Sequence, residues 1–173
     1  MSIQPIALLG NPVLRVPCSP VREPQSASAR KIVRDLTDTL HDFRRRTGFG
    51  RGISAPQIGA GVRIICIDHE FRGALINPTI RRRSRKMFRL WDDCFSFPDL
   101  LVEVRRHLTV DVEFLDGHGR RQQLRATGGL SELLQHEIDH LDGVLAIDRA
   151  ISPAHIVLRS EFNRHIQPAS HLL

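Results

Sequence analysis

The chain has 173 residues, of which 41% are hydrophobic and 25% are charged, the composition of an ordinary globular protein with one core. Its apolar runs are too short to cross a bilayer, and its first residues lack the basic start and apolar stretch of a secretory signal, so we expect a cytoplasmic protein with no membrane partner. The net charge of +6 comes almost entirely from arginine and would suit work near a polyanion such as the ribosome.

The first sixty residues are expected to contain one helix between two irregular stretches. The segment through Pro24 carries five prolines and should be irregular surface structure. Apolar residues recur at helical spacing from Ile32 to Phe43, which predicts an amphipathic helix that ends before Gly48. The glycine-rich stretch 48–61 should then form a loop.

Two short strands and a charged loop are predicted next. Residues 62–67 and 74–80 have the composition of strands, and Asn77-Pro78 is a turn signal that should close the second one. The basic run 81–86 follows this signal and has no interleaved aromatic residues, so we expect a solvated loop. Nucleic acid is therefore not expected to be the primary ligand.

The second half of the chain is predicted to contain a hairpin followed by a helix. Apolar and polar residues alternate over 108–114, a turn signal follows at 116–119, and 122–126 would supply the partner strand. Apolar residues at helical spacing then indicate a helix from about Leu130 to a stop near Gly143.

A last amphipathic helix is expected from Pro153 towards His165. No repeat or low-complexity linker divides the chain, so residues 1–173 should form a single domain. The prediction is an α+β fold with short, mostly antiparallel strands around the central helix.

This central helix carries the sharpest motif of the sequence, His136-Glu137-Ile138-Asp139-His140. Residues four apart lie on the same face of a helix, so both imidazoles can bind one cation. Glu137 lies close enough to contact a water on that cation and to shuttle its proton, because a divalent ion lowers the pKa of bound water towards ~7. The alternative is a pair of exposed helix histidines, but the apolar opposite side of the helix favours a metal site.

A catalytic metal needs a third protein ligand, and the residues by themselves leave two candidates. The third histidine of one zinc protease pattern is missing, because Ala146 stands at its position after Gly143. Glu161 is at a workable distance for the other common protease arrangement, which would make an endopeptidase. Cys94 could instead bind as a thiolate stabilised by the cation. The odd number of cysteines favours free thiols, and Cys66 is expected to be a small buried residue.

Three stretches together resemble the peptide deformylase family, and the likeness extends over nearly the whole chain. They are Gly50-Arg51-Gly52-Ile53-Ser54-Ala55-Pro56-Gln57, Asp92-Asp93-Cys94-Phe95-Ser96 and Gln135-His136-Glu137-Ile138-Asp139-His140-Leu141, in the family's order and with Asn77-Pro78 between the first two. The resemblance favours Cys94 over Glu161. It implies a tetrahedral metal site formed by Cys94, His136, His140 and water, with Fe²⁺ as the usual ion and Zn²⁺, Ni²⁺ or Co²⁺ able to replace it.

The resemblance also implies a reaction, the hydrolysis of the formyl amide of N-formylmethionyl peptides in protein biosynthesis. Glu137 would take a proton from the attacking water and deliver it to the leaving amine. The side-chain amide of Gln57 and the backbone N–H of Phe95 would stabilise the developing oxyanion. Gly52 would let the substrate backbone approach closely. Without the resemblance, Gln57 and Gly52 would be taken for ordinary loop residues.

The likeness is incomplete at residues expected to bind substrate. The middle motif reads Asp-Asp-Cys-Phe-Ser where the family pattern is Glu-Gly-Cys-Leu-Ser, so Asp93 adds charge beside the metal ligand and Phe95 reshapes the wall. Arg51 stands where an aliphatic residue is common. Glu132 precedes His136 by one helical turn and either faces the pocket or is exposed in the first turn. In the family this pocket accepts a methionine side chain, so Asp93 and Glu132 inside it would favour a polar or cationic substrate.

Three functions follow from the resemblance and its gaps. The first is a metallohydrolase that deformylates N-formylmethionyl peptides. The second is a divergent hydrolase that acts on a different N-formyl or N-acyl amine. The third is a catalytically silent, deformylase-like binding protein.

Overall fold

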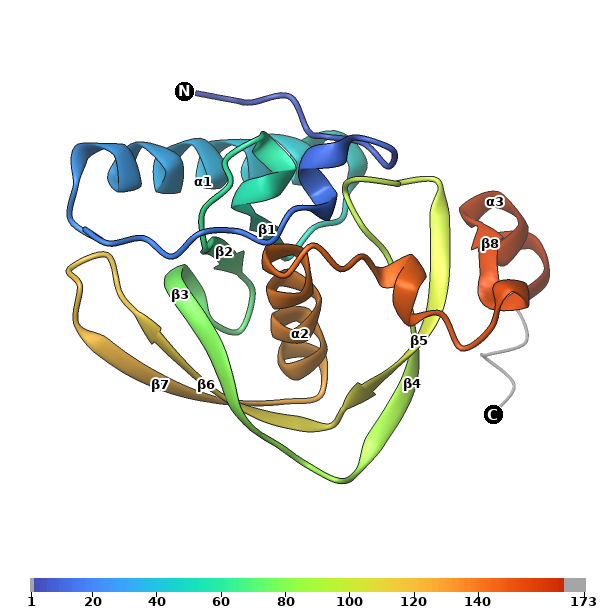
Figure 1. The fold of residues 1–173 in the computed structure, drawn as a ribbon. Helices are drawn as coiled ribbons and strands as arrows, with labels where there is room; N and C mark the ends of the chain where they lie inside the picture. Colours follow the sequence, from blue (N-terminus) through green and yellow to red (C-terminus); the bar gives the residue numbers. More distant parts are fainter. Residues whose placement is uncertain (1, 167–173) are drawn as a thin grey trace.

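Helix α2 (Gly129–Leu141) stands at the centre of the molecule, with strands curving around it and helix α1 (Ala27–Thr47) lying across one end (Figure 1). The computed structural model describes residues 2–166. The strands are β1 (Gly52–Ser54), β2 (Ile64–Asp68), β3 (Arg72–Arg83), β4 (Met87–Asp92), β5 (Leu100–His107), β6 (Thr109–Leu115), β7 (Arg121–Thr127) and β8 (Ile156–Leu158). Short helical segments occupy Pro12–Arg15, Ala55–Ile58, Ala146–Arg149, Pro153–His155, α3 (Arg159–Glu161) and Phe162–Ile166.

Helix α1 confirms the amphipathic helix predicted from the sequence. The Ser26 side chain accepts a hydrogen bond from the Ala29 backbone N–H at its start, and Gly48 ends it in the left-handed conformation at φ 80°. Its apolar stripe, including Leu36 and Leu40, packs on β1 and β2. None of the helices within residues 2–166 combines the length and the apolarity needed to cross a membrane.

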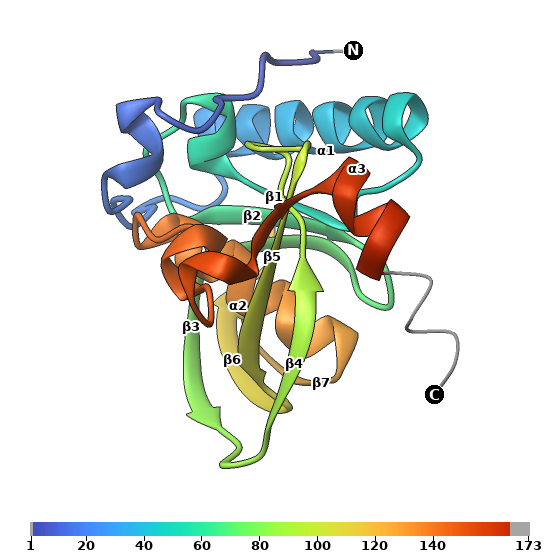
Figure 2. The same cartoon turned by 90° about the vertical axis from the view of Figure 1, so that its right-hand side faces the viewer.

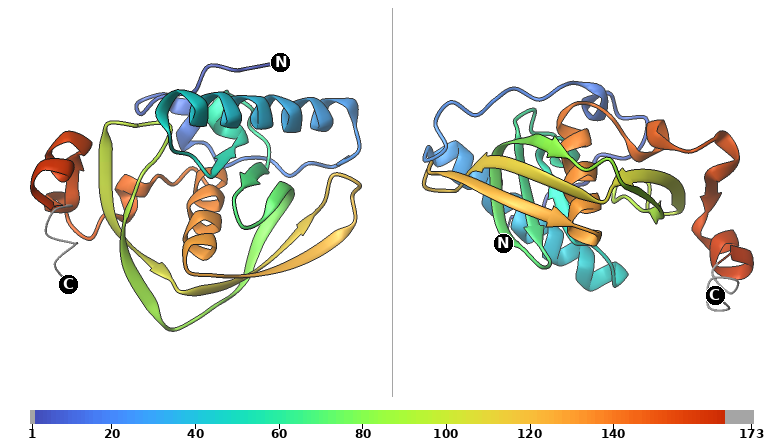
Figure 3. Two further views of the ribbon diagram at one scale, coloured as in Figure 1. Left: turned by 180° about the vertical axis from the view of Figure 1, so that it is seen from behind. Right: turned by 90° about the horizontal axis from the view of Figure 1, so that it is seen from below.

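The larger sheet has the order β1-β2-β3-β6-β7, and every neighbouring pair is antiparallel (Figure 3). The predicted strand at 62–67 and the predicted hairpin are both present. However, Asn77-Pro78 does not close β3. Asn77 adopts φ 52°, its side chain bonds the backbone of Val21, and the register with β6 shifts while the strand continues. Arg81–Arg83 therefore belongs to a strand, and the prediction of a loop is wrong for these three residues.

The smaller sheet has the order β4-β5-β8 and contains elements that the sequence did not predict (Figure 2). Strand β8 replaces the helix expected from Pro153 to His165, and only short helical turns follow it. The β-branched residues Ile156 and Val157 pair with the edge of β5, so the sheet contact overrides the helical spacing. The end of the described chain is thereby attached beside the loop that joins β4 to β5.

Helix α2 is buried on nearly all sides because it lies inside the curve of both sheets. Apolar residues such as Leu134 and Ile138 pack against β2, β3 and β6. The helix ends at Leu141, and Gly143 reverses the chain at φ 73°, where an added Cβ would lie 2.7 Å from the Arg15 carbonyl oxygen. Its polar face carries the His136–His140 motif, so the central position of the helix places charged side chains in the interior.

Candidate active site

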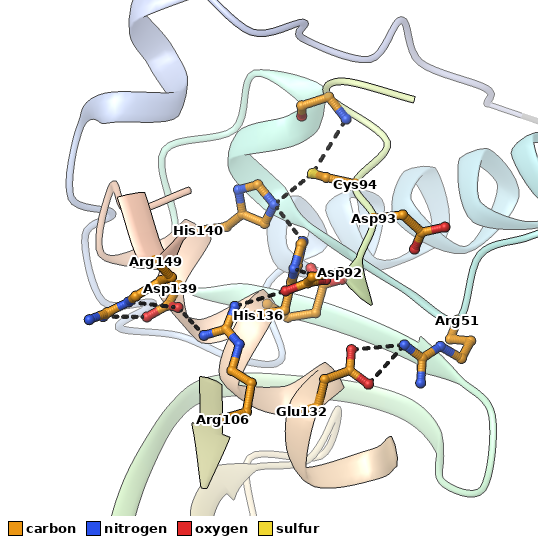
Figure 4. Close-up of polar contacts among 12 residues, drawn as sticks. Arg51, Asp92, Asp93, Cys94, Arg106, Glu132, His136, Asp139, His140 and Arg149 are labelled. Atoms are coloured by element: carbon orange, nitrogen blue, oxygen red, sulfur yellow. Dashed lines mark hydrogen bonds and ion pairs between the residues drawn. The ribbon is translucent and has the colours of Figure 1, made fainter. Parts of the chain in front are cut away.

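Three potential metal ligands meet at the polar face of α2. The ligand atoms of Cys94, His136 and His140 all lie within 4.8 Å of one another, and the three residues are buried. The Cys94 Sγ is 3.2 Å from the His140 Nε2, which is 3.2 Å from the His136 Nε2 (Figure 4). One thiolate and two imidazole nitrogens form a donor set that suits divalent iron or zinc.

The structure decides against Glu161 as the third member of this group. Its side chain is 47% exposed and pairs with Arg164 at 3.0 Å and His165 at 3.4 Å. It belongs to α3 and is not part of the ligand cluster, so the endopeptidase alternative loses its metal ligand. Cys66 is a small core residue as expected, and burial raises the pKa of its thiol to about 12.

A buried network of charges holds His136 from behind. The His136 Nδ1 is 2.9 Å from an Asp92 carboxylate oxygen, and Arg106 lies between Asp92, at 3.1 Å, and Asp139. Arg149 closes the network with a 2.9 Å contact to Asp139. Burial opposes ionisation of Asp92, but His136 and Arg106 outweigh it and lower the pKa of this carboxyl to about 2.

Asp92 in turn holds the pKa of His136 above its ordinary value despite burial. The orienting role of Asp92 was missed in the sequence, although its place in the middle motif was noted. A carboxylate that fixes the second ring nitrogen of a metal-binding histidine is a common arrangement. The signal that could have found it is an acid two residues before a ligand cysteine.

Glu137 lies on the same helix with its carboxylate beside strand β1. The Ser54 hydroxyl donates a 2.5 Å hydrogen bond to the Glu137 Oε2. Burial raises the pKa of Glu137, although His136 and the Ser54 hydrogen bond oppose the shift. A Cβ on Gly52 would lie 2.9 Å from the Glu137 Oε1 and 2.8 Å from Ile67. Gly52 is thus needed to make room for the carboxylate, which is a different reason from the one that the sequence suggested.

Gln57 directs its amide nitrogen at the ligand cluster. Its Oε1 accepts a 2.9 Å hydrogen bond from the Ser54 backbone N–H, so the Nε2 is turned towards the Cys94 Sγ at 3.6 Å and the Ser96 Oγ at 3.3 Å. The 3.3 Å contact with Ser96 is long for an N–H···O hydrogen bond, so this donor can turn to a ligand at little cost. The expected oxyanion donor is therefore beside the predicted metal ligands.

Phe95 fills the wall that the sequence expected it to reshape. Its ring stacks on Phe43 with centroids 3.8 Å apart, and it meets Phe49 edge-on at 6.3 Å. A Cβ on Gly50 would lie 2.5 Å from the Phe95 ring, and Gly50 has φ 126°. The larger aromatic residue is accommodated because the glycine opposite leaves space for it.

A cavity of about 630 Å³ opens over the ligand cluster. Asp93 and Glu132 both line it, so the alternative in which Glu132 is exposed is wrong. The Glu132 carboxylate is 2.8 Å from the Arg51 guanidinium. Asp93 pairs at 3.1 Å with Arg159, which comes from α3. The sequence singled out both acids as cavity residues but did not predict either pairing.

The last described segment reaches the cavity rim through Arg159 and Phe162. The Arg159 guanidinium lies 4.5 Å over the Phe49 ring, and the Phe162 ring is 5.1 Å from that of Trp91. Phe49 and Trp91 both line the cavity. Segments far apart in the sequence thus form one rim.

Comparisons with known proteins agree in fold and sequence. The family model described as polypeptide deformylase matches residues 3–155. Peptide deformylases of Brucella suis and Rhizobium meliloti are 39% and 38% identical over 154 residues, which cover 86% of this chain and 85% of each relative.

Solved structures show the same likeness. A Thermotoga maritima peptide deformylase has a TM-score of 0.81 at 30% identity, covering 88% of this chain and 100% of that one. A Synechococcus elongatus peptide deformylase in complex with actinonin has a TM-score of 0.81 at 32% identity, covering 98% and 87%. A Met-Ala-Ser-bound Acinetobacter baumannii peptide deformylase has a TM-score of 0.79 at 26% identity, covering 86% and 99%.

Proposed function

Because this chain belongs to the peptide deformylase family, we propose that its cavity binds an N-formylated peptide with the formyl amide next to a divalent metal ion held by Cys94, His136 and His140. Peptide deformylases are metallohydrolases that remove the formyl group from N-formylmethionyl peptides, and this chain is such a hydrolase. The observation that carries the proposal is the meeting of the three ligand atoms beside Glu137 and Gln57.

The metal we propose is Fe²⁺, with Zn²⁺, Ni²⁺ and Co²⁺ as ions that the same ligands suit. A divalent ion bound there would activate water by lowering its pKa and would polarise the formyl oxygen. The support is the donor set of one sulfur and two nitrogens, together with the Asp92 carboxylate behind His136. This carboxylate fixes which ring nitrogen faces the other ligands.

Glu137 is the residue we propose for moving the proton. Its side chain is buried, at 3% exposed. Burial moves its pKa towards neutral pH, which suits a group that must first accept and then release a proton. The Ser54 hydroxyl donates to one carboxylate oxygen and fixes its direction. Glu137 accepts the proton of the attacking water and donates it to the leaving nitrogen, so that formate and a free amine result.

Gln57 and the Phe95 backbone N–H are the donors we propose for the developing oxyanion. The Gln57 Nε2 is held on the cluster side by the hydrogen bond from Ser54 to its Oε1. A donor fixed before the reaction is typically worth a few kcal/mol in the transition state, here on the order of 3 kcal/mol. Gln57→Ala is accordingly expected to lower kcat more than it changes KM.

The proposed substrate is a nascent N-formylated peptide, which would be met in the cytoplasm near the ribosome. Complexes of the Synechococcus relative with actinonin and of the Acinetobacter relative with Met-Ala-Ser support a peptide in this cavity. The net charge of +6 is compatible with work beside ribosomal RNA.

The test is metal analysis and formate release on one anaerobically purified sample. We expect about one equivalent of metal and formate release from formyl-Met-Ala-Ser that is lost in Glu137→Ala. Cys94→Ser should lose the metal, whereas the matched carboxylate change Glu161→Ala should keep both metal and activity. A sample with full metal that releases no formate from any formylated peptide would support the silent binding protein instead.

A further inference from the structure

One wall of the cavity is an ion pair that no step of the hydrolysis uses. The Arg51 Nη2 is 2.8 Å and 3.0 Å from the two Glu132 carboxylate oxygens. The Arg51 Nη1 also donates to the Gly129 carbonyl oxygen at 3.3 Å, which holds the guanidinium on α2. In Figure 4 the pair lies to one side of His136, away from Cys94 and His140.

The pair is placed where the first side chain of a bound peptide would lie. Glu132 is one helical turn before His136 on the same face of α2. Arg51 precedes Gly52, whose Cα faces the Glu137 carboxylate. Both charged residues line the cavity, as do Cys94 and His136 of the three predicted metal ligands. A formyl amide held at Glu137 therefore has its adjoining side chain within reach of the pair.

Because the Arg51–Glu132 pair is largely buried, its free energy depends on the polarity of the group that covers it. Glu132 is only 4% exposed, whereas the Arg51 side chain is 35% exposed and faces the cavity. Burial raises the pKa of Glu132 even though Arg51 opposes the shift. One nitrogen serves both carboxylate oxygens, so each oxygen keeps a lone pair, and Arg51 keeps N–H groups that have no acceptor among residues 2–166.

Three kinds of substrate side chain would meet this wall differently. An apolar or thioether side chain would displace water from the pair without replacing its hydrogen bonds. A charged side chain would leave a net charge in a site that the pair has already neutralised. A neutral amide can donate to Glu132 and accept from Arg51 at the same time, and its length in glutamine is close to that of a methionine side chain.

We propose that the Arg51–Glu132 pair is a specificity determinant that favours N-formyl peptides whose first side chain ends in a neutral hydrogen-bonding group, with glutamine as the best match. Formylmethionyl peptides remain substrates, with a lower kcat/KM. This inference rests on the proposed function, because it assumes that a formylated peptide occupies the cavity.

The experiment compares formyl-Gln-Ala-Ser with formyl-Met-Ala-Ser, two probes that differ in polarity at nearly equal length. We expect the kcat/KM ratio of the glutaminyl to the methionyl peptide to fall at least tenfold in the double variant Arg51→Met/Glu132→Leu. The matched control is Arg81→Met/Glu113→Leu, which removes an exposed pair of the same charges at 2.6 Å on β3 and β6. Its ratio should stay within twofold of that of the unaltered chain. A ratio within threefold of the unaltered chain in the Arg51/Glu132 double variant would overturn the proposal.

A conservative variant keeps the test decisive if the double variant does not fold. Glu132→Gln retains hydrogen bonds to Arg51 and to a substrate amide, so it should keep the preference within threefold, whereas Glu132→Leu should lose it. Loss of the preference in both, or in neither, contradicts the inference.

A binding measurement separates this inference from the proposed function. In the Glu137→Gln background, the dissociation constants of the two peptides are measured by calorimetry, with no turnover required. Glutaminyl binding that is tighter by at least fivefold, and that depends on Arg51 and Glu132, supports the inference even if the unaltered chain releases no formate, in which case only the proposed function fails. Equal binding of both peptides overturns the inference.

Discussion

The charged residues on the two sides of the active-site cavity differ in how deeply they are buried. On the ligand side, Arg106 and Asp92 are 4% and 3% exposed, and their network continues to the metal-binding face of α2. On the substrate side, the Arg51–Glu132 and Asp93–Arg159 pairs each have a member that is about one-third exposed. Removing one member of a buried network leaves its partners unpaired, whereas both members of a pair that opens to the cavity on one side can be exchanged together at a smaller cost. The catalytic side is therefore constrained, and the substrate side is free to change its specificity.

The largest expected effect is on the constrained side. Arg106→Met would leave the buried Asp92 and the half-buried Asp139 with fewer partners, and we expect a loss of about 3–5 kcal/mol in the free energy of unfolding. Metal affinity should also fall, by roughly 10–100-fold, because His136 is less well oriented. Urea unfolding and competitive chelation measure the two effects. Arg105→Met, at the neighbouring exposed position of β5, is the control, and an equal effect there would argue against the comparison.

The next effect concerns the space around Glu137. Gly52→Ala places a Cβ 2.9 Å from the Glu137 Oε1, so the carboxylate must move. We expect kcat to fall by about 100-fold, the order of loss that a misplaced catalytic group causes, with the metal content unchanged. Gly61→Ala, where an added Cβ meets nothing within 4 Å, should leave kcat unaffected. Full activity in Gly52→Ala would show that the position of this carboxylate is not critical.

On the substrate side, Arg159→Ala should have a smaller effect. The change removes the contact with Asp93, the Nε hydrogen bond to the Pro98 carbonyl oxygen and the stacking on Phe49, each worth about 0.5–1 kcal/mol at most for a partly exposed group. We expect KM to rise about threefold with little change in kcat. Steady-state kinetics with Arg164→Ala as the control checks this, since Arg164 pairs with Glu161 and is not among the described residues that line the cavity. A fall in kcat without a change in KM would place Arg159 on the constrained side.

The smallest effect is a change in the pH dependence of stability. Burial raises the pKa of Glu132 above 4.5, so this group favours the folded state at low pH and loses that contribution as the pH rises through the folded-state pKa. Glu132→Gln should therefore flatten the decline of the unfolding free energy above pH 4.5. Glu113 has the opposite shift, because hydrogen bonding from Arg81 lowers its pKa. Glu113→Gln should accordingly change the slope of the unfolding free energy against pH in the opposite direction. A change of the same sign in both variants would contradict the two pKa shifts.

The sequence predicted the parts of the fold whose pattern is local. The apolar stripe of α1, the alternation in β6 and the His136–Glu137–His140 spacing each lie within a short window. Strands β4 and β5 were missed because charged residues such as Arg89 and Glu103 occupy their solvent face and hide the apolar alternation. The sequence predicted a helix after Pro153, where the structure has β8. This strand forms by pairing with β5, and no local pattern reveals a partner that is distant in the sequence.

The features of the active site also divide into those that a local motif identifies and those that depend on contacts between distant residues. Cys94, His136, His140, Glu137 and Gln57 were identified through motifs, and the structure brings them together. The pairing of Arg51 with Glu132 joins residues 81 positions apart, and that of Asp93 with Arg159 joins residues 66 apart. No local pattern encodes such contacts, because they depend on how the sheets fold around α2. The assignment of residues 1–173 to a single domain stays a prediction.

Trp91 gives this molecule a built-in optical reporter. It is the only tryptophan of a chain that contains no tyrosine, so emission excited at the red edge of the protein absorption band comes from one indole. That indole lines the cavity and contacts Phe162 from the last described segment. Its spectrum should therefore respond to a ligand entering the cavity and to displacement of the segment that carries Phe162. Fluorescence titration can follow both events without a label.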